Sequence, residues 1–475
     1  MSAPPRDVVA ALWHDAQLPA DGLDHLDLIG HDPVLPSSFA VGTAVQASLG
    51  AAALAAELWH QRSAGGARQR VSVDMTHAAL DSCGHFSLDG LVPDPWDRLS
   101  GLYPCGADTT PGWVRIHANF AHHRERALRL LGCATGPETE RAAVAQALRS
   151  WRAEDFELAA ANAGAVVAAL RSFDEWDAHP QSRVVAARPL VSIERIDAAG
   201  QADPLRWPAL ARGAAPLHGL RVLDLTRILA GPVAGRTLAA YGAEVMLLNA
   251  PHLPNIASIA DTSRGKLSAL VDLRESTGRD ALRHLLRDAH VFMQGYRPGA
   301  LAALGFAPTE LARLRPGIVC VSLSAYGPGG PWANRRGFDS LVQTATGLNH
   351  AEAQAAGAAQ PKALPMQALD YSAGFLLAFG TQAALWRQQA EGGSWQVQVS
   401  LAGVAHWLRG LGSVADGFAV TPLPFEPYLE YADSGFGRLG ALRHAAQFSL
   451  TPARWAQPSM PPGSHPPVWP PTMPA

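Results

Sequence analysis

Strand-like and helix-like stretches alternate regularly from residue 217 onward. Apolar runs with the length of buried strands occur at residues 221–225, 244–248, 268–273, 291–293 and 317–323. Stretches of helical length lie between them, at residues 231–241, 277–289 and 298–304. An alternation of strands and helices is typical of a parallel sheet that is wound with helices on both faces. We therefore expect an α/β protein whose main domain, residues 216–419, is a Rossmann-like, doubly wound parallel sheet.

Two distant segments share one pattern. Residues 43–59 and 370–386 are both rich in small residues, and both end in tryptophan. Each segment is followed by a Gly-Gly pair and an alternating apolar stretch, which predicts a helix, a turn and a strand. A partial internal repeat explains this most simply. Aligned on the tryptophans, Thr43 stands where the second segment has Asp370, and residues 1–94 are predicted to be a degenerate partial copy.

The remaining stretches differ from both patterns. Residues 95–196 combine short apolar strands with charged helices, which predicts a small α+β domain. Residues 197–215 are polar and contain proline, as expected of a linker. Residues 420–475 are rich in proline and aromatic residues, which predicts an extended C-terminal segment.

Composition narrows the functional class. The chain has 475 residues, of which 48% are hydrophobic and 17% charged, so it can bury a large core. A net charge of −3 disfavours nucleic acid as a partner. The four cysteines are scattered, which argues against a disulfide framework or a zinc site and fits a reducing compartment. With no signal-peptide pattern and no long uninterrupted apolar stretch, we expect a cytoplasmic protein without a membrane partner.

Asp370 is the most informative single residue. It stands at the start of a helix predicted over residues 372–386, where an aspartate can cap the first turn. The same position favours the anionic form of a carboxylate, which also suits a nucleophile. From the local sequence alone the cap is the more common role. Thr43 could cap a helix as well, but it offers no carboxylate.

The turns of the predicted sheet indicate a phosphate-bearing ligand. Ligands of such sheets bind at the carboxyl ends of the strands. The first turn, residues 225–235, has no GxGxxG and contains Pro232, which disfavours a nicotinamide cofactor, and no carboxylate and histidine cluster supports a metal. Isolated histidines such as His117 are expected to be surface or core residues. Several turns instead combine Arg or Lys with Gly, as suits guanidinium contacts to an elongated phosphate ligand. These turns are residues 263–266, 271–274, 295–300 and 335–339.

The same region resembles family III CoA-transferases, the formyl-CoA and carnitine CoA-transferase type. The similar motifs are residues 216–232, 238–245, 263–266, 297–301, 323–332, 337–339 and the Asp370 segment. They occur in the family's order and cover residues 216–407 densely. Residues 101–106 with 113–117 are similar to the start of the family's small domain. The domain order departs from the family, in which the large domain usually comes first.

The resemblance implies a CoA-transferase of the EC 2.8.3 type, which moves CoA from an acyl-CoA donor to a carboxylic acid acceptor. In the family the aspartate matching Asp370 is the nucleophile and forms an aspartyl-CoA thioester. Residues 327–330 are glycine-rich and are expected to close over the site and donate backbone N–H groups to the oxyanion. Acyl-CoA and CoA are expected as substrates, with no permanently bound cofactor and no metal, in a homodimer. The positions matching the family's CoA contacts are Leu229, Ala230, Val271, Asp272, Leu273, Arg274, Gly295, Tyr296, Arg297, Arg336, Gly337, Phe338 and Asp339.

Departures from the family keep two alternatives open. Leu229 replaces a glutamine of formyl-CoA transferase, Asn249 replaces an acid, and Ala303 replaces an arginine. An isomerase of the same fold, similar to α-methylacyl-CoA racemase, pairs the equivalent aspartate with a histidine where this chain has Phe338. A phenyl ring cannot carry a proton, so the transferase is favoured. The rearranged order also permits a non-catalytic acyl-CoA-binding protein.

Overall fold

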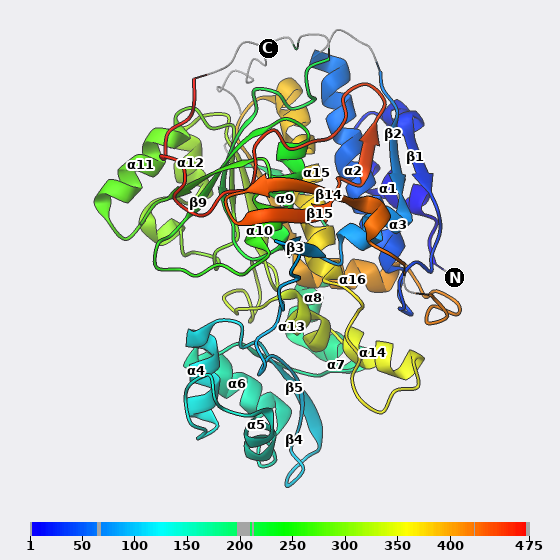
Figure 1. Cartoon of the computed structure of the whole chain (residues 1–475), viewed down its shortest axis with the longest axis vertical. Coiled ribbons are helices and arrows are strands. Elements are labelled where there is room, and N and C mark those ends of the chain that lie inside the picture. Colours follow the sequence, from blue (N-terminus) through cyan, green and yellow to red (C-terminus); the bar gives the residue numbers. More distant parts are fainter. Residues whose placement is uncertain (1, 64–67, 197–209, 211–212, 422, 472–475) are drawn as a thin grey trace.

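A seven-stranded sheet forms the centre of the protein. The computed structural model describes residues 2–63, 68–196, 210, 213–421 and 423–471, so the predicted linker at 197–215 lies largely outside the described residues (Figure 1). The strand order is β10-β9-β8-β11-β12-β13-β7. Neighbouring strands are parallel except for β7, which runs antiparallel to β13. The strands are β7 (Ser192–Arg195), β8 (Arg221–Leu225), β9 (Glu244–Asn249), β10 (Lys266–Leu270), β11 (Val291–Gln294), β12 (Val319–Ser324) and β13 (Trp395–Ser400).

Helices cover both faces of this sheet. Val222 and Val291 belong to one buried cluster together with α9 (Ala230–Ala240) and α15 (Ala368–Glu391). Their neighbours Leu223 and Phe292 belong to a second cluster with α11 (Ser276–Leu286) and α12 (Pro308–Leu314). Alternate strand residues thus point to opposite faces, and both faces are apolar because both are covered. The prediction of an α/β protein with a large, mainly parallel sheet is confirmed.

Some predicted helices differ from the observed ones. The helix expected at residues 298–304 is only a 3-10 turn, η2 (Ala302–Leu304), because the preceding segment holds Pro298 and Gly299. The sequence pattern did not predict α12, nor the two short helices that lie between β12 and α15. These are α13 (Asp339–Ala345) and α14 (Leu348–Ala355).

The N-terminal segment packs against the large domain. Its long helix α2 (Val41–Ser63) lies along α15 (Figure 1). The Gln382 amide of α15 donates to the Ala52 carbonyl (3.0 Å), and the Trp59 indole donates to the Gln382 carbonyl (3.1 Å). The two segments of the predicted repeat are therefore spatial neighbours, while the repeat itself stays a prediction. The other elements here are α1 (Pro5–Asp15), η1 (Ala20–His25), β1 (Leu26–Ile29), β2 (Val71–Asp74), α3 (Met75–Asp81) and β3 (Phe86–Leu88).

One helix is long and apolar enough to cross a membrane, judged by length and composition. It is the stretch Val41–Arg62 of α2, and its most apolar window is entirely buried inside the protein. Gln46 and Glu57 interrupt this stretch, as the sequence predicted, and the absence of a membrane partner stays a prediction. Small residues explain the burial, because alanine and glycine let helices approach closely.

A small α+β unit projects from the main body, at the bottom of Figure 1. It contains a three-stranded antiparallel sheet, β4-β5-β6, with helices packed against it. Two further helices, α7 and α8, lead from this unit to β7 in the large sheet. The elements are β4 (Gly101–Cys105), β5 (Gly112–Ile116), α4 (Ala121–Leu130), α5 (Arg141–Leu148), α6 (Ala153–Ala163), β6 (Val167–Ala169), α7 (Phe173–Ala178) and α8 (Pro180–Ala186).

The C-terminal segment is only partly extended. After α16 (Leu401–Gly410) and η3 (Glu426–Tyr428), the chain forms a hairpin of β14 (Leu429–Ser434) and β15 (Gly437–Leu442). The hairpin pairs with β3, and β16 (Ala446–Phe448) pairs with β2. Leu439 and Ala441 alternate inward against Phe86, which gives β15 a buried face. The predicted extended chain thus applies to the residues that follow β16.

Candidate active site

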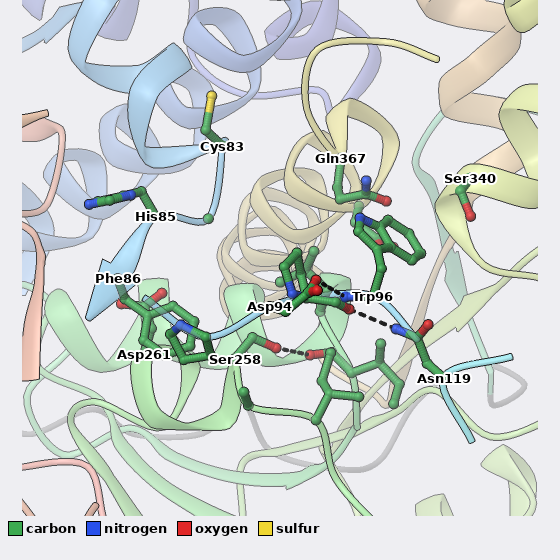
Figure 2. A pocket seen from close by; sticks show the side chains of 18 of the residues that line it. Cys83, His85, Phe86, Asp94, Trp96, Asn119, Ser258, Asp261, Ser340 and Gln367 are labelled. Atoms are coloured by element: carbon green, nitrogen blue, oxygen red, sulfur yellow. Dashed lines mark hydrogen bonds between the residues drawn. The ribbon is translucent and has the colours of Figure 1, made fainter. Parts of the chain in front are cut away.

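A cleft of about 520 Å³ opens where the N-terminal segment, the small unit, the large domain and Phe425 of the C-terminal segment meet. The N-terminal segment contributes residues 83–86, the small unit contributes His117 and Asn119, and the large domain contributes Asp370. The loop that joins β3 to β4 contributes residues 92–97. Figure 2 shows side chains from these segments, with His85, Trp96, Asn119 and Gln367 among the labelled ones. No single stretch of sequence forms this cavity.

Asp370 lines the cleft from the first turn of α15, but it does not cap that helix. The backbone N–H groups of Leu369 and Asp370 both donate to the carboxylate of Asp339, at 2.8 and 2.9 Å. Asp370 lies inside the first turn rather than before it, so its side chain cannot close on these donors. The interpretation of Asp370 as a helix cap is therefore wrong. Among the residues that the structure describes, none donates a hydrogen bond to the Asp370 carboxylate.

Asp339 holds the helix start from a distance in sequence. It is the first residue of α13, and its second oxygen accepts a hydrogen bond from the Gln343 amide. Burial raises the pKa of Asp339 to about 6, while the donated N–H groups, the Gln343 amide and the charge of Arg115 act in the opposite direction. With its hydrogen bonds made and Arg115 nearby, Asp339 is the better placed of the two carboxylates to hold a negative charge.

The Asp370 carboxyl is poorly placed for ionisation. Its residue is only 8% exposed, and burial raises its pKa well above the ordinary value of 3.8. The negative charge of Asp339 raises the pKa further. The expectation that the helix N-terminus favours the anionic form fails here, because Asp339 already uses those N–H groups. The anion of Asp370 thus forms only as the pH rises through a strongly raised pKa.

Two of the predicted CoA contacts lie in the same cleft as Asp370. They are Leu229, which precedes α9, and Phe338, which precedes α13. Ala230 is buried as the first residue of α9. Ile228, which directly precedes Leu229 and Ala230, has a left-handed backbone with φ of 79°. A β-branched residue rarely adopts such a conformation, and strained backbone of this kind concentrates at functional turns.

A second group of predicted contacts lies at the carboxyl ends of the strands. Val271, Leu273, Arg274 and Tyr296 line an apolar pocket of about 130 Å³. Asp272 pairs with Arg274 at 2.6 Å, so that guanidinium is already neutralised by a carboxylate. The chain runs from β8 to β9 and from β11 to β12, in opposite directions across the sheet, and ligands of such sheets bind beyond the carboxyl ends of the two strands between which the direction changes. Residues 229–230 and 295–297 follow these two strands.

Three arginines come together without carboxylate partners. The pKa of Arg336 is lowered by burial and by the positive charges of Arg297 and Arg126. Arg126 lies on α4 of the small unit, and its guanidinium donates to the Gly164 carbonyl (3.1 Å). Within the described part of the chain, no carboxylate forms an ion pair with any of the three. No local sequence signal pointed to Arg126, because its place beside Arg336 arises only from the packing of two domains.

The neighbouring Arg335 behaves differently. Its guanidinium lies 3.5 Å from the Glu157 carboxylate, which also binds Arg171 at 2.6 Å. Gly337, in contrast, is required by packing, because a Cβ at this position would lie 2.7 Å from the Ala325 side chain. The 335–339 turn therefore supplies one unpaired cation, Arg336.

Two expectations about other turns are wrong. The glycine-rich run 327–330 does not line the cleft, because Gln181 of α8 donates to the carbonyls of Tyr326 and Gly329 at 2.8 Å each. The cations of residues 263–266 are buried in ion pairs instead of facing a ligand. Arg264 binds Asp261 and Glu430, and Lys266 binds Asp224 at 2.8 Å. This turn precedes β10, so it lies at the wrong end of the strand for a phosphate.

His117 is the functional candidate that the sequence did not reveal. Its ring stacks on Phe338 with centroids 3.9 Å apart and an interplanar angle of 15°. It lines the same cleft as Asp370, and its buried Nδ1 has no hydrogen-bond partner. Burial lowers the pKa of His117 to about 3, with a further contribution from Arg115. The ring is therefore a neutral imidazole in the cleft, not a surface residue.

Comparisons with known proteins match the large domain. Residues 217–416 match the model of a family described as CoA-transferase family III. An acyl-CoA transferase of Gibberella moniliformis is 29% identical over 410 residues, which is 78% of this chain and 70% of that protein. A probable fatty acyl-CoA transferase of Mycobacterium tuberculosis, Rv3272, is 34% identical over 41% of this chain and 53% of that protein.

A crystal structure of Rv3272 is also similar, with a TM-score of 0.39 and 33% identity over 42% of this chain and 58% of that one. The chain therefore spans only about half of this relative, although it covers more of the fungal one. The matched segment contains the strands β8 to β13, the Arg297 and Arg336 turns, and Asp370. Residues 217–416 of this chain are thus similar to CoA-transferase family III.

Proposed function

We propose that this protein is a CoA-transferase that uses Asp370 to move CoA from an acyl-CoA donor to a carboxylic acid. One observation carries the proposal: the Asp370 carboxylate faces a cleft without a hydrogen-bond donor among the described residues, while Asp339 performs the capping role beside it. A buried carboxylate with no structural task is costly to keep. Such a group is a candidate for chemistry at the site.

The chemistry needs a single nucleophile. An Asp370 oxygen attacks the thioester carbonyl carbon, and the C–S bond breaks, which leaves a mixed anhydride and a CoA thiolate. The thiolate then attacks the Asp370 carbonyl carbon, so that an aspartyl thioester forms and the donor acid leaves as a carboxylate. The acceptor acid reverses both steps and departs as a new acyl-CoA. Retention of the CoA sulfur beside the anhydride makes the second attack effectively intramolecular.

Burial serves this sequence in two ways. A closed cleft keeps water from the anhydride, which would otherwise hydrolyse. Burial also leaves the Asp370 anion weakly solvated, so the anion that does form is a stronger nucleophile than an exposed carboxylate. The raised pKa of Asp370 is the cost of this arrangement, since its anion forms less readily than that of an exposed carboxylate.

The position of CoA follows from the free cations. Arg297 and Arg336, together with Arg126 of the small unit, suit phosphate groups because no carboxylate among the described residues neutralises them. Residues 295–297 and Leu229 follow the adjacent strands β11 and β8, and Leu229 lines the cleft of Asp370. CoA would thus lie across the carboxyl edge of the sheet, with its thioester at Asp370.

Trapping of the covalent intermediate tests the proposal. The protein is incubated with an acyl-CoA and no acceptor acid, treated with hydroxylamine, and analysed by intact mass and peptide mapping. We expect a hydroxamate at position 370 and none in Asp370→Asn. An unlabelled protein that still binds CoA with an affinity sensitive to Arg336→Gln would overturn the transferase and support a non-catalytic acyl-CoA-binding protein.

A second candidate is favoured by His117. An isomerase of this fold needs a second proton-carrying group, which Phe338 cannot supply. The structure stacks the imidazole of His117 on that phenyl ring, in the cleft that holds Asp370. Two bases in one cleft could remove and return an α-proton of the acyl group. Incorporation of deuterium at the α-carbon without acceptor acid, lost in both Asp370→Asn and His117→Gln, would establish this alternative.

A further inference from the structure

The cleft around Asp370 has carboxylates but no permanent cation. Its lining includes Asp94, Asp97 and Asp261 besides Asp370, and its described lining residues include no lysine or arginine. Asp97 is already paired with Arg124 at 2.7 Å, and Asp261 is paired with Arg236. Asp94 is exposed, and its carboxylate accepts a hydrogen bond from the Trp96 backbone N–H (2.9 Å). The charges available to a ligand in the cleft are therefore negative.

The two histidines of the cleft do not change this balance at neutral pH. Burial lowers the pKa of both His85 and His117 below the ordinary value for histidine. Each ring is also stacked on a phenyl ring: His85 lies on Phe425, with centroids 4.2 Å apart and an angle of 10° between planes. His117 lies on Phe338 in the same manner. Both rings therefore present neutral, largely apolar faces.

Apolar side chains form much of the remaining wall. Val92 is 60% exposed and stands on the loop between β3 and β4, where it forms the rim of the cleft. Leu91, its neighbour, is 75% exposed but does not line the cleft. An exposed apolar rim that leads into an apolar cleft is typical of a binding site for an apolar group. The apolar and aromatic side chains of the wall include Val92, Trp96, Ile228, Leu229, Phe338 and Phe425.

We propose that this cleft selects acyl groups that are apolar and uncharged, and that it discriminates against donors and acceptors with a second carboxylate. The inference rests on the proposed function, because donor and acceptor acids must occupy the same position beside Asp370. A second carboxylate would lose its hydration without gaining a cationic partner, and it would lie near the carboxylates of Asp94 and Asp370. An aliphatic or aromatic chain would instead bury apolar surface against the wall.

Matched donors test the selectivity. Butyryl-CoA and succinyl-CoA have four-carbon acyl groups and differ in the terminal carboxylate. With one apolar acceptor acid held constant, we expect kcat/KM for butyryl-CoA to exceed that for succinyl-CoA by roughly 10–100-fold. Comparison of kcat/KM cancels everything that the two donors share, including the CoA moiety.

A positive charge placed on the rim should bring the kcat/KM values for butyryl-CoA and succinyl-CoA closer together. Val92→Arg puts a guanidinium on the lining of the cleft, so we expect it to raise kcat/KM for succinyl-CoA and to lower that for butyryl-CoA only slightly. Leu91→Arg is the matched control, because it adds the same charge one residue away on an exposed side chain that does not line the cleft. The control should keep the wild-type ratio.

The outcomes separate this inference from the proposed function. Equal kcat/KM for the two donors, with an aspartyl adduct at position 370 from both, would overturn the selectivity and leave the transferase intact. A change of the ratio by Leu91→Arg as large as that by Val92→Arg would overturn the role of the cleft wall. If neither donor forms an adduct at Asp370, the selectivity and the transferase proposal both fail.

Discussion

The helices α2 and α15 begin with the same pattern of hydrogen bonds, and they carry Thr43 and Asp370 at equivalent positions of the first turn. In α2 the backbone N–H groups of Gly42 and Thr43 donate to Asp32, at 3.1 and 2.9 Å. In α15 the N–H groups of Leu369 and Asp370 donate to Asp339 in the same way. Thr43 also donates its hydroxyl to Asp32 at 2.7 Å, whereas Asp370 places a second carboxylate beside the one that caps the helix.

This difference separates a structural task from a chemical one. A hydroxyl next to the capping aspartate completes the hydrogen bonds of the helix start, so Asp32 and Thr43 together satisfy the start of α2. A carboxylate in that place repels the capping aspartate and adds nothing to the cap. The start of α15 is therefore less stable than it needs to be, and such a cost is expected where a residue is retained for function.

The substitutions Asp370→Asn and Thr43→Val should differ most in their effect on the rate of CoA transfer. Asp370→Asn should lower the rate of CoA transfer by at least about 10³-fold, because it removes the nucleophile. Thr43→Val should leave the rate within about twofold, since the hydroxyl hydrogen-bonds only to Asp32 among the described residues. Steady-state transfer assays with intact-mass detection of the adduct measure both. A Thr43→Val variant as inactive as Asp370→Asn would break the comparison.

Replacement of each capping aspartate by alanine should show that both residues stabilise the start of a helix. Asp32→Ala and Asp339→Ala each leave two backbone N–H groups without an acceptor, so each should lower the free energy of unfolding by about 1–2 kcal/mol. Only Asp339→Ala should also lower kcat, because Asp339 fixes the turn that holds Asp370. Urea unfolding and transfer assays on both variants check this. Equal losses of kcat would mean that the two helix starts contribute equally to the site.

The carboxylate of Asp370 should measurably lower the free energy of unfolding. The pKa of Asp370 is raised in the folded protein, so its contribution to stability is fully present below its ordinary pKa of 3.8 and is lost as the pH rises through the folded value. Asp370→Asn should thus raise the free energy of unfolding near pH 7 by about 1 kcal/mol or more. The gain should fade as the pH approaches 3.8. A gain that is independent of pH would point to packing instead of charge.

The sequence predicted the sheet more fully than the site. The strands β8 and β9 are short apolar runs bounded by turns, and local pattern alone placed them within a residue of their observed ends. The helix α13 was missed because residues 339–345 follow a run of Gly, Pro and Arg that resembles a loop. The start of α15 was placed four residues late, because its cap lies thirty-one residues away in Asp339.

The candidate site was predictable where it follows the family's motifs and not elsewhere. Asp370, Leu229 and Phe338 stand in motifs and meet in the cleft. His117 and Arg126 belong to the small unit, and nothing in their local sequence says which surface of the large domain they face. The pKa of Asp370 was also out of reach, because it depends on burial and on a charge from another helix.

Asp339→Asn tests whether the two carboxylates interact, and it should change the pH dependence of the reaction more than its maximum rate. Asparagine keeps an oxygen that can accept the two N–H groups of α15, but it removes the negative charge that raises the pKa of Asp370. The acid limb of kcat/KM, which reports the free enzyme, should therefore shift to lower pH. The position of the limb is independent of the maximum rate, so a modest loss of kcat from the altered contact with Gln343 does not obscure it. Asp32→Asn is the matched control and should leave the limb in place, because no carboxylate of a nucleophile stands beside it. A limb that does not move in Asp339→Asn would show that burial alone raises the pKa of Asp370, and the pairing of the two aspartates would then have no part in the chemistry.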